Sequence, residues 1–263
     1  MKRYIVFLKQ VPQSTRVEID PITKTLKRSS ALCKTNPDDL CALQAALNLK
    51  KKTGAEIVAV SMGPAKAENV LREALQHGAD RAILLSSRAF AGSDTWCTSA
   101  VLAAAVRKIG SYDILFFGRM AIDGDTAQVG PQIAEHLGIP VISYAQEIKV
   151  DGDAVIVKRQ YDDGYHMLKA KMPCLVTALS ELNEPRYMTP GGIFDAVNAE
   201  ITTLGRADLV DVDDSNIGLK GSPTKIAKAS DKVRKGAGEK VVPDSPDEAV
   251  SYIVGKLKDK HVI

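Results

Sequence analysis

One stretch of sequence decides the fold: Ile114-Leu115-Phe116-Phe117-Gly118-Arg119-Met120-Ala121-Ile122-Asp123-Gly124-Asp125-Thr126-Ala127-Gln128-Val129-Gly130. It begins with an unbroken apolar run, which is typical of a strand covered on both faces. A polar, glycine-containing loop follows. From 125 to 137 apolar residues then recur at helical spacing, and Gly138 marks the expected stop. Strand, loop and helix in this order predict one unit of a parallel α/β sheet.

The same unit recurs on both sides of this stretch. Further buried strands are predicted at Tyr4–Leu8, Ile57–Val60, Ala82–Leu85 and Leu175–Ala178. Helical patterns between the strands cover 38–52, 65–77 and 94–109, with Ser93 as the expected N-cap of the last. Regular alternation of strand and helix predicts an α/β fold with a doubly wound, mostly parallel sheet.

Two segments depart from this rhythm. Ala154–Lys158 and Tyr165–Lys169 flank the turn Asp162-Asp163-Gly164, which predicts an antiparallel hairpin at the edge of the sheet. From 180 to 243 Pro, Gly, Ser and charged residues dominate, with short apolar pieces only at 193–197 and 201–204, before a helical pattern returns at 246–259. We therefore divide the chain into an α/β domain, 1–180, and an extended C-terminal arm, 181–263, that folds on a partner.

Composition excludes several classes of protein. The 263 residues are 45% hydrophobic and 25% charged, as in a soluble globular protein. The longest apolar runs are far shorter than the ~20 residues of a membrane span. No signal-peptide core precedes the first strand, so we expect a cytoplasmic protein without a membrane partner. The net charge is +3, and the basic stretch 220–240 lacks aromatic residues for base stacking, which argues against nucleic acid.

No residue pattern indicates catalysis or metal binding by side chains. The four cysteines, at 33, 41, 97 and 174, form no CxxC pair and are predicted to be free and mostly buried. The sequence has no GxSxG or HExxH motif, and its four histidines are scattered. We predict no catalytic residue and no metal ligand.

The loop 118–130 is the first candidate site. A helix start offers unpaired amides to a phosphate, and Arg119 can add a bidentate cation. Thr126 and Gln128 can bond a ribose or ribityl hydroxyl, whereas Asp123 and Asp125 would repel phosphate and are expected to cap the helix. The loop matches neither the P-loop nor the GxGxxG pattern. A nucleotide or dinucleotide contact is the favoured interpretation, and a purely structural loop is the alternative.

Three other motifs lie near strand ends or helix starts. Asn36-Pro37-Asp38-Asp39 suits a helix start, and Ser61-Met62-Gly63-Pro64 follows a strand. Ligands of open α/β sheets bind at the carboxyl ends of strands. The alternative is a purely structural role, as a helix cap for the first motif and as an ordinary turn for the second. The third motif is Ala178–Tyr187, in which Leu182 is a lone apolar residue. It suits either an exposed anchor for a partner or a leucine that faces the core.

These motifs, in this order, resemble the small (β) subunit of electron-transfer flavoprotein, over essentially the whole chain. The resemblance rests on Val6-Phe7-Leu8-Lys9-Gln10-Val11-Pro12, Asn36-Pro37-Asp38-Asp39, Val60-Ser61-Met62-Gly63-Pro64, Gly78-Ala79-Asp80-Arg81-Ala82, Ala121–Gly130 and Leu182-Asn183-Glu184-Pro185-Arg186-Tyr187.

The resemblance implies a heterodimer with a larger α subunit that carries FAD, and a nucleotide in this chain. That nucleotide is a structural AMP in respiratory members, and an FAD reduced by NADH in an electron-bifurcating group from anaerobes. Arg186–Ile193 and Gly218–Thr224 look like the bifurcating group, although the hairpin residues Tyr161–His166 are more polar than expected. The implied cofactor contacts are Phe7, Lys9, Asn36, Asp39, Met62, Gly63, Arg119, Asp123, Gly124, Asp125, Thr126, Ala127, Gln128, Val129 and Gly130.

The resemblance also implies partners. The arm 181–263 would pack on the α subunit. The residues implied to dock a flavin-dependent dehydrogenase are Leu182, Asn183, Glu184, Pro185, Arg186 and Tyr187. That enzyme would be an enoyl-CoA reductase, an acyl-CoA dehydrogenase or a lactate dehydrogenase, and ferredoxin would take the other electron in the bifurcating case. The chain would then be an electron-carrier subunit whose flavin supplies the chemistry.

Two other functions stay open. The chain would be a non-bifurcating subunit if it holds structural AMP and only docks the dehydrogenase. It would belong to another class if it were an ATP-dependent enzyme on the same fold. The missing glycine-rich phosphate signature and the long C-terminal arm argue against that last function.

Overall fold

The computed structural model describes residues 2–13, 32–224 and 236–263, so the central part of the basic stretch 220–240 lies outside the described residues. The chain divides into two compact units, Met1–Ala227 and Lys228–Ile263. The boundary predicted at 180 therefore falls within the first unit.

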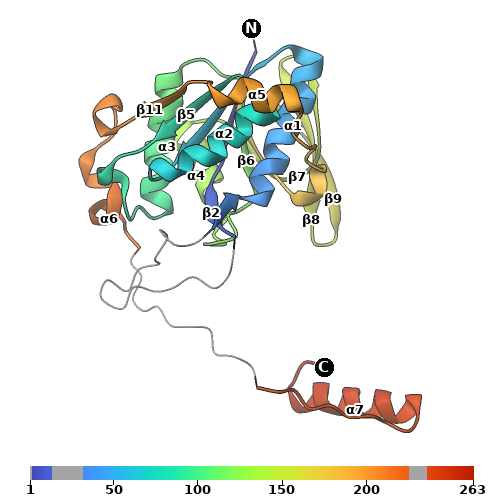
Figure 1. Ribbon diagram of the computed structural model, residues 1–263. Coiled ribbons are helices and arrows are strands. Elements are labelled where there is room, and N and C mark those ends of the chain that lie inside the picture. The colour runs from blue at the N-terminus through green and yellow to red at the C-terminus, as the bar shows by residue number, and fades with distance from the viewer. Residues whose placement is uncertain (1, 14–31, 225–235) are drawn as a thin grey trace. The chain divides into compact units, whose positions relative to one another are not determined.

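The first unit is built on a nine-stranded sheet in the described residues (Figure 1). Its strand order is β11-β5-β4-β1-β6-β10-β7-β8-β9. Every strand from β11 to β7 runs parallel to its neighbour, which confirms the predicted mostly parallel sheet. These strands are β11 (Ile201–Leu204), β5 (Arg81–Leu85), β4 (Glu56–Met62), β1 (Arg3–Phe7), β6 (Ile114–Gly118), β10 (Cys174–Ala178) and β7 (Val141–Asp151).

Helices cover both faces of this sheet. One core cluster joins α1 (Pro37–Thr53) and α2 (Glu68–His77) to alternate residues of the central strands. A second cluster joins α3 (Thr95–Ile109) and α4 (Val129–Leu137) to the residues between them. Burial on both faces explains why the central strands read as unbroken apolar runs, and it confirms the doubly wound arrangement.

Two predicted helix starts are wrong. Asp94, not Ser93, is the N-cap of α3, and its side chain accepts a hydrogen bond from the amide of Cys97 at 3.1 Å. Helix α4 begins at Val129 rather than near 125, because Asp125 and Ala127 have φ of 49° and 53°. This left-handed conformation cannot be part of an α-helix.

The antiparallel hairpin is where the sequence placed it. β8 (Ala154–Tyr161) and β9 (Gly164–Lys171) pair at the edge of the sheet. β7 joins them to the parallel part, since its first residues pair with β10 and its later residues pair with β8 across a bulge.

Residues 180–221 belong to the first unit rather than to an extended arm. Helix α5 (Pro190–Val197) packs against α2, and β11 returns to the sheet as an edge strand beside β5. The short helical turns η3 (Ser180–Leu182), η4 (Arg206–Asp208) and η5 (Asp214–Asn216) and helix α6 (Gly218–Gly221) complete this segment. Leu209, Val212 and Ile217 are buried in the cluster of α3 and α4. The two apolar pieces left within the predicted arm thus become a helix and a strand.

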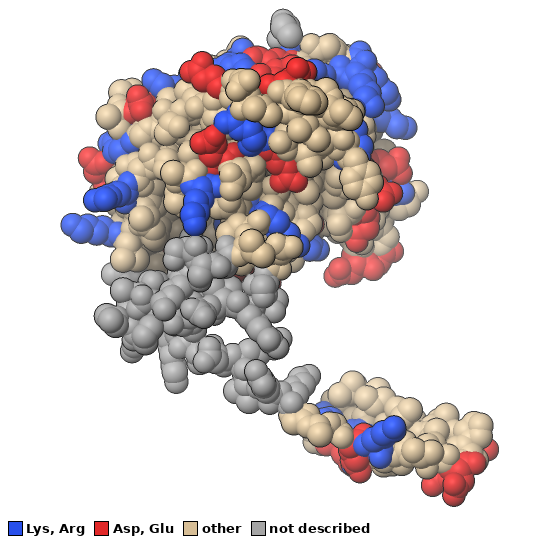
Figure 2. All heavy atoms as spheres, in the orientation of Figure 1, with Lys and Arg blue, Asp and Glu red and all other residues tan. Residues whose placement is uncertain are grey.

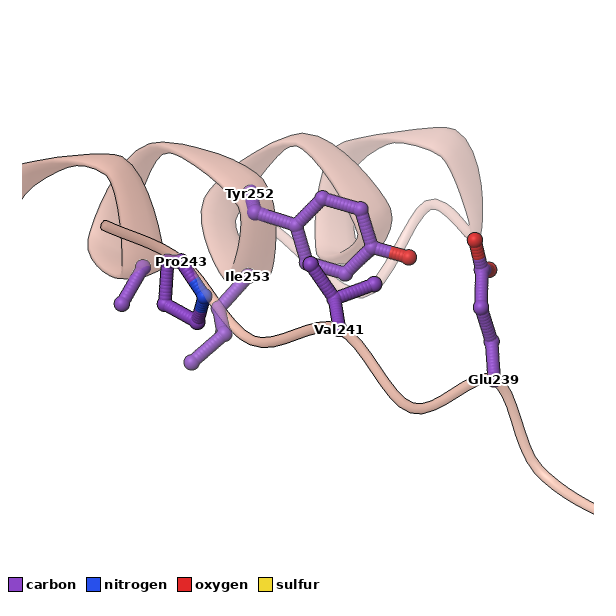
Figure 3. Close-up of a pocket in the computed structure, with 6 residues that line it drawn as sticks. Glu239, Val241, Pro243, Tyr252 and Ile253 are labelled. Carbon is purple, nitrogen blue, oxygen red and sulfur yellow. The ribbon is translucent and has the colours of Figure 1, made fainter. Parts of the chain in front are cut away.

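The second unit contains helix α7 (Pro246–Asp259), as predicted for 246–259. The preceding segment runs beside the helix, and Val241 and Pro243 line a shallow pocket with Tyr252 and Ile253 (Figure 3). No residue of α7 is buried, and the side chains of Val250 and Ile253 are 59% and 57% exposed. This unit therefore has no core of its own among its described residues.

The surface carries mixed charge. On the face shown in Figure 2, acidic and basic side chains of the first unit lie interspersed. Elsewhere in the described residues, ion pairs such as Lys50–Asp80 and Arg72–Glu68 join side chains of opposite charge. Within the described residues, no helix combines the length and the apolar character that crossing a membrane requires.

Candidate functional site

The predicted site motifs meet at one edge of the sheet. The chain passes from β1 to β4 and β5 on one side, and then crosses back to β6 on the other side of β1. The strand order therefore reverses at β1, and ligands of open α/β sheets bind at the carboxyl ends of the strands beside such a reversal. Phe7, Met62 and Gly118 end the three adjacent strands β1, β4 and β6 at this point.

Asp39 joins the first turn of α1 to the ends of β1 and β6. Its Oδ2 accepts a hydrogen bond from the amide of Lys9 at 2.8 Å, and its Oδ1 accepts one from the amide of Gly118 at 3.0 Å. Burial raises the pKa of this carboxyl to about 7, although the hydrogen bonds from the two amides lower it. The negative charge of the neighbouring Asp38 adds to the rise. Asp39 was predicted as a cofactor contact, and both of its oxygens are engaged inside the protein.

Asn36 holds the 118–130 loop against α1. It stands at the N-cap position, as predicted, but its side chain does not cap the helix. Instead, its Nδ2 donates to the carbonyl of Met120 at 2.9 Å, and its Oδ1 accepts from the amide of Ile122 at 3.2 Å. The side chain thus supplies hydrogen-bond partners for two backbone groups of the loop, the carbonyl of Met120 and the amide of Ile122.

Two cationic side chains at the site, Lys9 and Arg119, are paired with acidic neighbours. Lys9 Nζ lies 2.7 Å from Asp123 Oδ1, and Arg119 Nε lies 3.5 Å from Asp38 Oδ2. The prediction that Asp123 and Asp125 cap α4 is wrong, because no side chain caps that helix. Asp123 is instead neutralised by Lys9, so its negative charge repels an anion at this edge less strongly.

The middle of the 118–130 loop is exposed to solvent. Residues 122–126 and Gln128 are exposed, and the left-handed Asp125 and Ala127 alternate with Thr126 and Gln128. In the part of the chain that the structure describes, the amides of Thr126, Ala127 and Gln128 have no hydrogen-bond acceptor. Unpaired amides in alternating conformations are the arrangement from which anion-binding nests are built. Left-handed residues other than glycine are strained, and such strain gathers at ligand sites.

Three glycines of the predicted site differ in their surroundings. A Cβ on Gly118 would lie 2.4 Å from Asp39 Oδ1, and one on Gly130 would lie 3.2 Å from the side chain of Thr177. A Cβ on Gly124 would meet nothing within 4 Å. Gly118 and Gly130 therefore serve close packing, whereas Gly124 borders open space. Gly63 follows the end of β4, and its amide donates to the carbonyl of Leu85 at 3.0 Å. Val129, also a predicted contact, is the first residue of α4.

Thr95, in the first turn of α3, is a site residue that the sequence analysis missed. Its Oγ1 donates to Gln128 Oε1 at 3.0 Å and accepts from Gln132 Nε2 at 3.4 Å. The start of α3 therefore borders the loop. The available signal was the position of Thr95 after β5, whose carboxyl end lies at the same edge of the sheet.

The segment predicted to dock a dehydrogenase lies on α1 and α2. Asn183 Nδ2 donates to the carbonyl of Cys41 at 2.9 Å, and one guanidinium nitrogen of Arg186 donates to the carbonyl of His77 at 2.6 Å. Leu182 is half-buried against the core cluster of these helices, whereas Tyr187 is 96% exposed. Glu184 is exposed and Pro185 half-buried. The docking role of this segment stays a prediction.

These features define a doubly wound α/β protein with a candidate cofactor site at its topological switch point. A family model described as "Electron transfer flavoprotein domain" matches residues 23–214. The electron transfer flavoprotein subunit beta of Clostridium acetobutylicum is 51% identical over 259 residues, which cover 98% of this chain and 99% of the relative. The chain belongs to the electron transfer flavoprotein family, among its β subunits.

Two other relatives are named for the complexes in which they act. The caffeyl-CoA reductase-Etf complex subunit CarD of Acetobacterium woodii is 45% identical over 262 residues, covering 99% of this chain and 100% of the relative. The acryloyl-CoA reductase electron transfer subunit gamma of Anaerotignum propionicum is 45% identical over 268 residues, again covering 99% and 100%.

Proposed function

We propose that this chain and an α subunit form a bifurcating electron transfer flavoprotein. FAD bound at the switch point takes electrons from NADH, and these electrons divide between ferredoxin and a flavin-dependent dehydrogenase or reductase. The observation that carries this proposal is the exposed middle of the 118–130 loop, where the amides of Thr126, Ala127 and Gln128 have no acceptor among the described residues. The two relatives named as subunits of reductase complexes support it.

The residues at the switch point have distinct roles in this proposal. The amides of Thr126, Ala127 and Gln128 bind the diphosphate, as the positive end of a helix and a nest of amides favour. Asn36 and Asp39 hold the loop and the strand ends in place, and the pairing of Lys9 with Asp123 keeps a negative charge from opposing the phosphates. The bound flavin supplies the hydride-accepting chemistry.

The alternative is a subunit that holds AMP as a structural ligand. The same amides would bind its single phosphate, so the loop alone favours neither nucleotide. Gly124 is exposed and a Cβ there would meet nothing within 4 Å, so the loop leaves room for either nucleotide, and it is the relatives named as reductase-complex subunits that favour FAD.

Cofactor analysis of the purified heterodimer tests the proposal. We expect two FAD per heterodimer and loss of the flavin absorbance when NADH is added. One FAD with one AMP, in a protein that does not react with NADH, would establish the structural-AMP alternative instead.

The second unit is proposed to pack on the α subunit. Helix α7 has no buried residue, and Val250 and Ile253 expose apolar side chains that water disfavours. Burying this side against a partner would supply the core that the described residues of the unit lack.

Leu182→Ala is expected to weaken docking of the dehydrogenase about thirtyfold, the equivalent of roughly 2 kcal/mol for an interface hot spot. The measurement is the rate of electron transfer to a flavin-dependent acyl-CoA dehydrogenase as its concentration is varied. Flavin content and reduction by NADH should remain normal.

Leu204→Ala is the matched control, because Leu204 is also a half-buried leucine that packs against a core cluster. It should cost similar stability and leave transfer unchanged. Equal transfer rates in the two variants would mean that Leu182 only packs against the core.

A further inference from the structure

The segment 218–224, which we call the arm root, is fastened to the residues that precede α3. The amide of Leu219 donates to the carbonyl of Ala91 at 3.0 Å, and the amide of Gly218 donates to Ser93 Oγ at 3.0 Å. The conformation requires glycine at 218, where φ is 62° and a Cβ would lie 2.3 Å from the carbonyl oxygen of Ala89. These contacts therefore hold the arm root in one defined position next to the residues that precede α3.

Four polar residues, Ser93, Asp94, Ser222 and Thr224, form the centre of this contact, and we call them the clasp. The amide of Asp94 donates to Ser222 Oγ at 2.9 Å, and that hydroxyl donates to the carbonyl of Gly218 at 2.7 Å. Ser222 is 4% exposed. A buried hydroxyl with both functions satisfied fixes the geometry around it, because breaking either bond leaves an unpaired polar group.

The carboxylate of Asp94 serves two elements at once. Its Oδ1 accepts from the amide of Cys97 and caps α3, and its Oδ2 accepts from both the amide and the hydroxyl of Thr224, at 3.0 and 2.8 Å. Desolvation raises the pKa of this carboxyl, but these hydrogen bonds lower it by more, so the group is charged at neutral pH. The arm root is thus bonded directly to the first turn of α3.

The same turn of α3 contacts the 118–130 loop. Thr95, next to Asp94, donates to Gln128, the last residue before α4. Gln132, whose amide donates to the carbonyl of Gln128 at 3.0 Å, also donates to Thr95. Hydrogen bonds therefore join Thr224 to Asp94 and Thr95 to Gln128, and the peptide bond between Asp94 and Thr95 connects the two contacts.

We propose that Asp94 is a positioning residue of the cofactor site, and that the arm root and the 118–130 loop are seated together through it. The inference rests on the proposed function for the identity of the ligand, but the coupling itself concerns this chain alone. When Thr224 leaves Asp94, the first turn of α3 loses its outer support and Gln128 loses its fixed partner. Cofactor binding and seating of the arm root then favour each other.

Two variants remove the clasp while keeping the fold. Thr224→Val deletes the hydroxyl at nearly constant volume. Asp94→Asn keeps a good N-cap for α3 but leaves one oxygen where two are needed. Thr224→Ser keeps the hydroxyl and should therefore keep the hydrogen bond to Asp94 and behave like the wild type. Thr203→Val, at an exposed position of β11, is the matched control.

The first measurement is amide hydrogen exchange in the full-length chain without nucleotide. We expect exchange at the amides of Asp125 and Gln132 to rise roughly tenfold in Thr224→Val and in Asp94→Asn, the effect of losing a hydrogen bond to a charged group. The double variant should add little more, because both changes break one series of contacts. Faster exchange confined to 218–224 would overturn the proposal and leave the clasp as an anchor of the arm root only.

The second measurement is titration of the full-length chain, with its α subunit, by FAD and separately by AMP. The dissociation constant of whichever nucleotide binds should rise roughly tenfold in the two clasp variants and stay at the wild-type value in Thr224→Ser and Thr203→Val. Equal affinity in all variants would contradict the coupling. If AMP alone binds and its affinity changes as described, the coupling through Asp94 is supported, and the proposed FAD function is contradicted.

Discussion

Gly124→Trp is expected to lower the flavin content from two to one per heterodimer and to abolish reduction by NADH. The indole would occupy the open space beside Gly124 that the proposed FAD requires, since no atom lies within 4 Å of a Cβ built there. Its backbone is not in the left-handed region, so a side chain adds no strain. The fold should therefore survive while the cofactor is excluded. Flavin content per heterodimer and the absorbance change with NADH measure this result.

Gly191→Trp is the matched control for that substitution. Gly191 lies in the first turn of α5, and a Cβ there also meets nothing within 4 Å. This variant should keep both flavins. Two flavins in Gly124→Trp would show that the cofactor does not use this space, and would contradict the proposed position of the FAD.

Gly118→Ala is expected to lower the free energy of unfolding by about 3 kcal/mol or more, the upper range for overpacking a buried site. The new methyl group would lie 2.4 Å from Asp39 Oδ1 and 2.7 Å from the backbone carbon of Asp38. Relieving the clash must separate α1 from β6 and break the hydrogen bond between Asp39 and the amide of Gly118. A buried carboxylate that loses a donor adds to the cost.

Urea unfolding of the full-length chain measures the effect, with Gly124→Ala as the control. The control places a methyl group in open space and should change stability by less than about 0.5 kcal/mol. If both variants unfold at the same urea concentration, the close approach of α1 to β6 is not needed for the fold.

The sequence alone determined the elements whose pattern is local. Central strands such as Ile114–Gly118 read as unbroken apolar runs because helices bury both of their faces. The hairpin and helix α7 were also predicted, since a turn motif and a helical stripe each span only a few residues. Because β1, β4 and β6 were predicted to be parallel, their carboxyl ends had to share an edge, and the general location of the site followed.

Only the tertiary structure decided which residues meet at that edge and what each one does there. Strand β11 is short and half-exposed, and it exists as a strand because β5 offers it a free edge. Asp39 looked like a first-turn carboxylate, yet its partners Lys9 and Gly118 are 30 and 79 positions away in the chain. Asp94 and Thr224 are 130 positions apart. Periodicity and capping report interactions among near neighbours in the chain, whereas these contacts depend on packing between distant segments, which no local pattern encodes.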